Sequence, residues 1–210
     1  MVALIVTMPA SIAREFVTLP PQITAVYGRL GTGRVQMVGG YSLSWDVDAR
    51  ALLRLRLRYD VSLEGPDTLL VGAASVSPWA IEVSELTGRA GAGLLVLTPD
   101  VLVESCSSRA VVDVQMLRLT RDAAAADGRV SIDAGSCIDA AGRQQTVPQM
   151  TVDMLTQGGD AVAILTDLGG QLARITLAGD RRLIIRVEPE GATLVPGLPT
   201  SGPLILEYPL

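Results

Sequence analysis

The chain contains no lysine and no histidine, and arginine is its only basic residue. These absences exclude a Ser-His-Asp triad, a Cys-His pair, a Ser-Lys dyad and a lysine Schiff base. Two cysteines combined with carboxylates alone would make an unusual zinc site. Carboxylate acid–base chemistry remains, but no spacing of acidic residues in the sequence predicts it. We therefore expect a protein that is not an enzyme and has no metal and no cofactor.

Aromatic residues are also scarce, at 3% of the chain, whereas hydrophobic residues make up 49%. The core must therefore be built mainly from valine, leucine, isoleucine and alanine. The 21 glycines and 12 prolines are spread along the chain, which favours many turns between short strands. The net charge of −5 comes without any basic block, so the sequence argues against a nucleic-acid partner.

Only two cysteines are present, Cys106 and Cys137. They either form a disulfide in an oxidising compartment or stay free as small buried hydrophobic residues. Composition and spacing leave both interpretations open.

The N-terminal segment has an apolar run, residues 1–8, that is far shorter than the about twenty residues of a membrane-spanning helix. The segment also lacks the charged start and the cleavage site of a signal peptide. It is either the end of a membrane anchor or a short docking helix over residues 9–17, ended by Pro20 and Pro21. We assign residues 1–20 to this anchor or helix and residues 21–210 to a single β domain.

A period of two in hydrophobicity dominates the chain after Pro21, which is typical of half-buried strands. In the segment 41–48, Tyr41, Leu43, Trp45 and Val47 alternate with polar residues. We expect a short apolar strand at 23–28. The strands at 33–39, 41–48, 52–63 and 68–76 are expected to form a meander of antiparallel hairpins.

The segment 52–63 carries a row of arginines, Arg54, Arg56 and Arg58, on one side of its predicted strand. This row could contact an acidic partner or lipid headgroups. The alternative is a solvated outer face that discourages edge-to-edge aggregation.

The second half of the chain continues the β pattern. Ser77, Pro78 and Trp79 have the order of a helix start, so we expect a short helix from there to Leu86. Residues 122–128 read as a loop or a single helical turn. Further strands are predicted at 94–104, 110–119, 129–133, 149–155, 160–166, 171–178, 183–188 and 203–208. The sequence thus predicts a mainly β fold, namely a curved antiparallel sheet or half-open β roll with one or two short helices.

Several short motifs resemble protein N of the type II secretion system. Its segment of leucine and prolines is matched by Leu19, Pro20 and Pro21. Its glycine motif and the strand pair that follows are matched by Gly28, Leu30, Gly33, Arg34, Leu43, Trp45, Leu52 and Leu53, while Arg29 and Gly31 depart from the motif. Further on, the segment from Gly128 to Cys137 and Gly142 resembles a cysteine-containing segment of the family.

This resemblance implies an accessory subunit anchored in the inner membrane, with its β domain on the periplasmic face. Its partners would be other components of the secretion system, in the inner-membrane platform or the periplasm, and its task would be the export of folded proteins. The oxidising periplasm would favour a disulfide between Cys106 and Cys137. The alternative function is an envelope protein that binds lipid or another hydrophobic ligand in a concave apolar β groove.

Overall fold

Thirteen strands form one continuous antiparallel sheet in which each strand pairs with the next one in the order of the sheet. The computed structural model describes residues 20–48, 57–97, 103–139, 142–194 and 198–209. The sheet consists of β1 (Ile23–Gly28), β2 (Thr32–Met37), β3 (Ser42–Val47), β4 (Leu57–Glu64), β5 (Leu69–Val76), β6 (Ala80–Gly91), β8 (Arg109–Thr120), β9 (Ala124–Ile132), β12 (Met150–Gln157), β13 (Asp160–Thr166), β14 (Gln171–Leu177), β15 (Arg182–Val187) and β16 (Leu204–Pro209).

A second, three-stranded sheet has the order β11-β10-β7. Its strands are β7 (Val103–Cys106), β10 (Gly135–Asp139) and β11 (Gln144–Val147). The helical segments are short, namely η2 (Val38–Gly40), η3 (Ala92–Leu97) and α4 (Pro189–Ala192). Among the described residues, no helix has the length and apolar character needed to cross a membrane.

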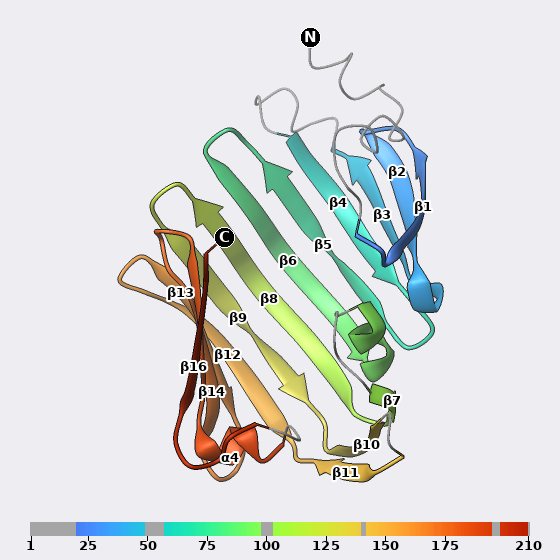
Figure 1. The fold of residues 1–210 in the computed structure, drawn as a ribbon. Coiled ribbons are helices and arrows are strands. Elements are labelled where there is room, and N and C mark those ends of the chain that lie inside the picture. The colour runs from blue at the N-terminus through green and yellow to red at the C-terminus, as the bar shows by residue number, and fades with distance from the viewer. Residues whose placement is uncertain (1–19, 49–56, 98–102, 140–141, 195–197, 210) are drawn as a thin grey trace.

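The large sheet is strongly curved and open, as Figure 1 shows. Its edge strands, β1 and β16, have no partner strand on their outer sides among the described residues. The three-stranded sheet, η2 and η3 lie toward one end of the long strands (Figure 1). No described helix or second sheet lies over most of the length of β5, β6 and β8.

The two faces of the sheet differ in polarity because the side chains alternate. In the β3–β4 pair, Ser44 lies opposite Ser62 and Asp46 lies opposite Asp60, whereas Leu43 lies opposite Leu63. We call these the polar face and the apolar face. The buried core lies on the apolar face, where Leu70, Val112 and Val114 form a cluster. The side chains packed against this cluster are only partly buried, namely Leu63, Leu86, Ala90, Leu117, Val130 and Met154.

The structure confirms the predicted fold class, a mainly β chain with a curved antiparallel sheet that is not closed and with few short helices. The predicted meander over the first strands is also present, and it continues to β16.

The predicted helix from Ser77 to Leu86 is wrong, because this segment is a turn followed by β6. The Ser77 hydroxyl closes this turn instead of capping a helix. It donates a hydrogen bond to the carbonyl oxygen of Ala80 and accepts one from the backbone N–H of Ala80. After that turn Ile81 and Val83 alternate with Glu82. This period of two places β6 between β5 and β8, and pairing on both sides overrides the local helix-start signal.

Two further predictions need correction. The strand predicted at 94–104 is the 3₁₀ segment η3 followed by the short strand β7, with residues 98–102 outside the described part. The loop predicted at 122–128 is shorter, because β9 already begins at Ala124. The predictions for residues 1–19, for Leu52 and Leu53, and for Arg54 and Arg56 lie outside the described residues.

Candidate functional site

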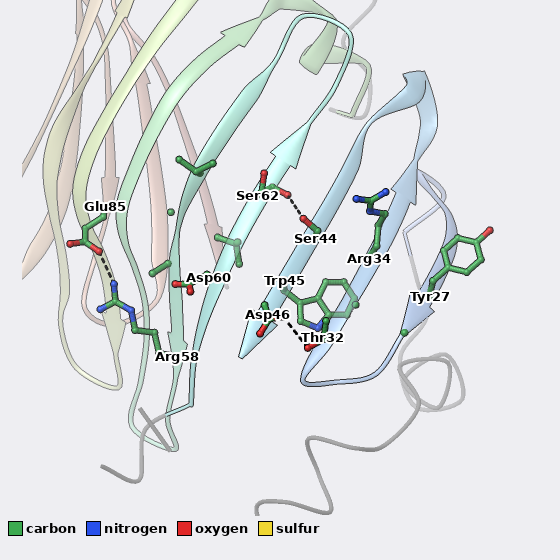
Figure 2. A pocket seen from close by; sticks show the side chains of 16 residues that line it. Tyr27, Thr32, Arg34, Ser44, Trp45, Asp46, Arg58, Asp60, Ser62 and Glu85 are labelled. Carbon is green, nitrogen blue, oxygen red and sulfur yellow. Dashed lines mark hydrogen bonds and ion pairs between the residues drawn. The ribbon is translucent and has the colours of Figure 1, made fainter. Parts of the chain in front are cut away.

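A pocket of about 760 Å³ lies on the polar face at the N-terminal side of the sheet (Figure 2). Six consecutive strands of the meander, β1 to β6, contribute to it. It is lined by Tyr27, Gly28, Thr32, Gly33, Arg34, Ser44, Trp45, Asp46, Arg58, Asp60, Val61, Ser62, Val71, Gly72, Ala73 and Glu85.

Trp45 lines this pocket from β3, but its indole alternates with Ser44 and Asp46 and so lies on the face of Leu43. The ring is held by neighbours on β2 and in the turn before it. Its indole Nε1 donates a hydrogen bond to the carbonyl oxygen of Leu30 over 3.0 Å. Gly33 is the cross-strand partner of Trp45, and a β-carbon on Gly33 would overlap the indole ring. Glycine at position 33 therefore leaves the space that the ring occupies. This contact explains why this glycine and this tryptophan occur together.

Gly28 serves the turn between β1 and β2. Its φ of +90° lies in the left-handed region, which disfavours other residues. A β-carbon there would lie 2.6 Å from the carbonyl oxygen of Thr32. Both constraints select glycine at this position.

Two of the charged groups in the pocket are paired with each other. Arg58 Nη2 lies 2.6 Å from Glu85 Oε2, joining β4 to β6 across β5. Glu85 has a φ of +55° and lies in a β-bulge between the cross-strand pairs Val71–Thr87 and Ala73–Ser84. Bulges redirect side chains and are common beside functional sites, and this one brings the Glu85 carboxylate within reach of Arg58.

Two other charged groups in the pocket are unpaired. Arg34 and Asp60 have no hydrogen-bond or ion-pair partner within the part of the chain that the structure describes. Asp60 is also the cross-strand partner of Asp46, so two carboxylates lie side by side on β3 and β4. Thr32 donates a hydrogen bond to Asp46 over 3.2 Å. Like charges placed opposite each other are unfavourable, so a cationic group from outside would stabilise this pair.

The structure brings together most of the residues that the sequence singled out. Gly28, Gly33, Arg34 and Trp45 line the pocket, and the carbonyl group of Leu30 anchors Trp45. From the arginine row, Arg58 also lines it.

Sequence reasoning missed the acidic members of the pocket, Asp46, Asp60 and Glu85. The alternation along residues 41–48 already places Asp46 on a polar face. Its register against Asp60 depends on how the chain returns between β3 and β4, which residue spacing alone does not determine. The position of Glu85 depends on the bulge in β6.

The two cysteines are direct cross-strand partners in the small sheet, and they form a disulfide. The bond joins β7 to β10, far along the chain from the pocket. Within the described residues, no group of three or more cysteine and acidic side chains is arranged to hold a metal ion.

Comparison with known proteins adds no relative. No family model, no curated protein and no solved structure matches this chain.

Proposed function

We propose that this chain is a non-catalytic accessory subunit of the type II secretion system, at the periplasmic face of the inner membrane. It would support the export of folded proteins through contacts with other components of the system. One observation carries the proposal: the motif residues Gly28, Gly33, Arg34 and Trp45, on which the resemblance rests, converge on one pocket.

The chemistry of this pocket suits contact with a protein. Arg34 and Asp60 offer one unpaired charge of each sign. Tyr27 adds aromatic surface beside them. Arginine, tyrosine and tryptophan are the residues most enriched at the energetic centres of protein interfaces. A partner segment that carries both an acidic and a basic side chain would therefore complement the pocket.

The test is a secretion assay in a strain that has the secretion system but lacks the gene for this chain. We expect the deletion to lower release of a secreted enzyme into the medium and the wild-type gene to restore it. The double variant Arg34→Ala, Asp60→Asn should restore release several-fold less well at equal protein level. The matched control is Arg129→Ala, Asp153→Asn, which removes a paired arginine and aspartate outside the pocket.

Two results would refute parts of this proposal. Normal secretion in the deletion strain would refute the role in secretion. Full complementation by the pocket variant would refute the pocket as the contact surface.

A second candidate function is the binding of lipid or another hydrophobic ligand on the apolar face. It is favoured by the partial burial of that face, where the side chains around Leu70, Val112 and Val114 keep exposed surface. Protein purified from periplasm without detergent should then release an apolar compound on solvent extraction, detected by mass spectrometry in about equimolar amount. Extracts without such a compound would contradict this function.

A further inference from the structure

The two edges of the large sheet differ in regularity. β1 contains an irregularity between Ile23 and Ala25 in its pairing with β2. By contrast, β16 pairs with β15 along six consecutive residues without a shift. Bulges, charged side chains and prolines protect edge strands from pairing with other chains. β16 has no bulge, and Glu207 and Pro209 lie in its C-terminal half, which leaves Leu204 to Leu206 without such protection. We propose that β16 is a self-association edge, at which a second copy of this chain adds its own β16.

The direction of the strands selects this arrangement over a head-to-tail one. All twelve pairings that connect the thirteen strands are antiparallel, so β1 and β16 run in the same direction. Translating a second copy would therefore place its β1 parallel to β16. A two-fold axis perpendicular to the sheet instead pairs β16 with β16 in the antiparallel manner of the whole sheet. It also keeps the apolar faces of both copies on the same side.

The side chains of β16 select one register. Residues paired across the axis must face the same side, so their numbers must be both even or both odd. Pairing Leu206 with Leu206 of the second copy uses Leu204 to Tyr208, with Leu204 opposite Tyr208 and Ile205 opposite Glu207. Moving the centre to Glu207 would set two carboxylates against each other, which is unfavourable. Moving it to Ile205 would pair only Leu204 to Leu206, because β16 begins at Leu204.

The charges are compatible with the same register. Arg186 on β15 is the cross-strand partner of Ile205, and its guanidinium is ion-paired with Glu188 over 2.7 Å. On the polar face, the row across the interface then reads Arg186, Ile205 and Glu207 of the second copy. This row places charges of opposite sign, and no like charges, on the two sides of Ile205, and the two-fold axis repeats it once.

The exposure of the strand fits an edge that is covered on association. Ile205 is 54% exposed and Tyr208 is 49% exposed, which leaves two large apolar side chains at the open edge. An exposed apolar edge strand is a template for another strand. This inference is independent of the proposed role in secretion.

Sedimentation velocity over a range of concentrations tests the proposal on the whole, disulfide-bonded chain. We expect a monomer–dimer equilibrium in the wild type. A lysine replacing Ile205 would face Glu207 of the second copy, so Ile205→Lys should tighten the dimer about 2- to 10-fold at low salt. Ile205→Glu should weaken it by a similar factor. Circular dichroism must show both variants folded like the wild type.

Cysteine cross-linking tests the register even if a charge variant fails to fold. Leu206→Cys places two thiols at the two-fold axis, at the about 4.5–5.5 Å Cα spacing of paired strands, and should oxidise to a covalent dimer. Ile205→Cys on the same strand is the matched control, because its thiols lie too far apart to bond. Val26→Cys on β1 is the control for the other edge.

Three results would overturn the proposal. They are a monomer at every concentration up to about 100 µM, a dimer with the same affinity in both Ile205 variants, and cross-linking of Val26→Cys rather than Leu206→Cys.

Discussion

The Tyr41 hydroxyl donates a hydrogen bond to Asp67 Oδ1 over 2.6 Å, and so links the start of β3 to the turn between β4 and β5. Asp67 Oδ2 also accepts the backbone N–H of Gly93, at the start of η3. Thr68, the next residue, accepts the N–H of Gly91 at the end of β6. One carboxylate and its neighbour thus hold η3 against the hairpins.

Replacing Tyr41 by phenylalanine should lower the free energy of unfolding by about 1.5–3 kcal/mol at pH 7, because a hydrogen bond to a charged group is lost. Burial raises the pKa of Asp67, but bonds from Tyr41, Gly93 and Thr68 outweigh this effect and hold that pKa below its ordinary value. Asp67 therefore stabilises the fold above its unfolded pKa of about 4, and this contribution is lost as the pH falls through the lower, folded pKa.

The loss caused by Tyr41→Phe should accordingly be largest near neutral pH and shrink on acidification below about pH 4. Urea unfolding of both proteins at several pH values measures it. A difference that stays constant down to the pH at which Asp67 is protonated would contradict this role of the hydrogen bond.

Adding one methyl group at Gly33 should displace the Trp45 ring. We expect Gly33→Ala to cost about 1–3 kcal/mol, as is typical of overpacking, and to shift tryptophan fluorescence. The background should carry Trp79→Phe, so that Trp45 is the only tryptophan. Gly202→Ala is the control, because a β-carbon there meets no atom within 4 Å. Equal stability of the two variants would show that Gly33 does not make room for the ring.

Two valines on opposite faces of β8 can test which face of the sheet carries the core. Val114 is 2% exposed and belongs to the core cluster, whereas Val111 is 50% exposed. Val114→Ala should lower stability by about 1–3 kcal/mol through cavity formation. Val111→Ala should change it by less than about 0.5 kcal/mol. A comparable loss from both would indicate that the polar face is also covered.

Breaking the disulfide should destabilise the fold by about 3–4 kcal/mol in the chain-entropy model. The bond joins cysteines 31 residues apart. The measurement compares chemical unfolding of Cys106→Ser, Cys137→Ser with the oxidised wild type, and the reduced wild type should behave like the variant. An oxidised wild type no more stable than the variant would mean that the bond adds nothing.

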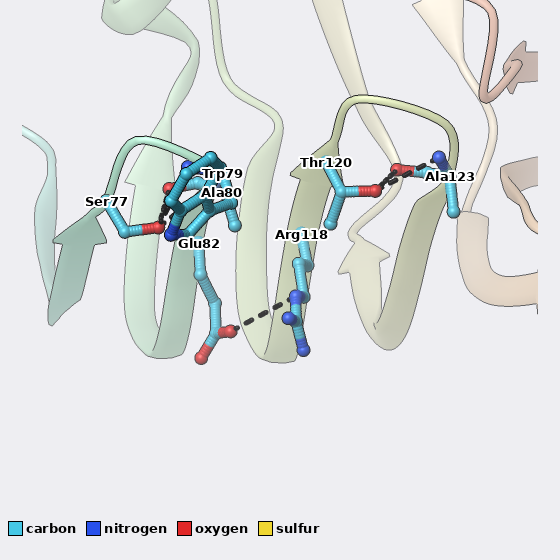
Figure 3. A network of polar contacts seen from close by, with 7 residues as sticks. All are labelled: Ser77, Trp79, Ala80, Glu82, Arg118, Thr120 and Ala123. Atoms are coloured by element: carbon cyan, nitrogen blue, oxygen red, sulfur yellow. Dashed lines mark hydrogen bonds and ion pairs between the residues drawn. The ribbon is translucent and has the colours of Figure 1, made fainter.

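Two turns at one end of the strands have the same construction (Figure 3). Ser77 Oγ and Thr120 Oγ1 each accept a backbone N–H three residues on, from Ala80 and Ala123. Ser77→Ala and Thr120→Val should each cost about 0.5–1.5 kcal/mol, because one hydrogen-bonded turn is opened. Thermal unfolding measures both losses. A markedly unequal effect would show that the two turns are not equivalent.

The β class of this chain follows from its local pattern. The period of two around Leu43, Trp45 and Val47, with glycines and prolines between the strands, already predicts hairpins. Antiparallel hairpins pair neighbours in sequence, so a local signal is enough to predict most of this sheet. Gly28, Gly33 and Trp45 line one pocket for the same reason, because they lie on neighbouring strands of this meander.

Where local and long-range preferences disagree, the sequence misleads. Ser77 and Pro78 resemble a helix start, but β6 gains backbone pairing from β5 and β8 on both of its sides. Likewise, the position of Glu85 depends on a bulge that only the pairing of β5 with β6 produces.

The sequence by itself determined the alternation of side chains, and with it the two faces of the sheet. Only the tertiary structure decided the register between β3 and β4, which sets Asp46 beside Asp60, and the curvature that keeps β1 and β16 as separate edges of the sheet in the described part of the chain. The physical reason is that alternation is a property of each strand alone. Register and curvature instead depend on how strands pair across turns, and on the packing of side chains from residues far apart in the chain.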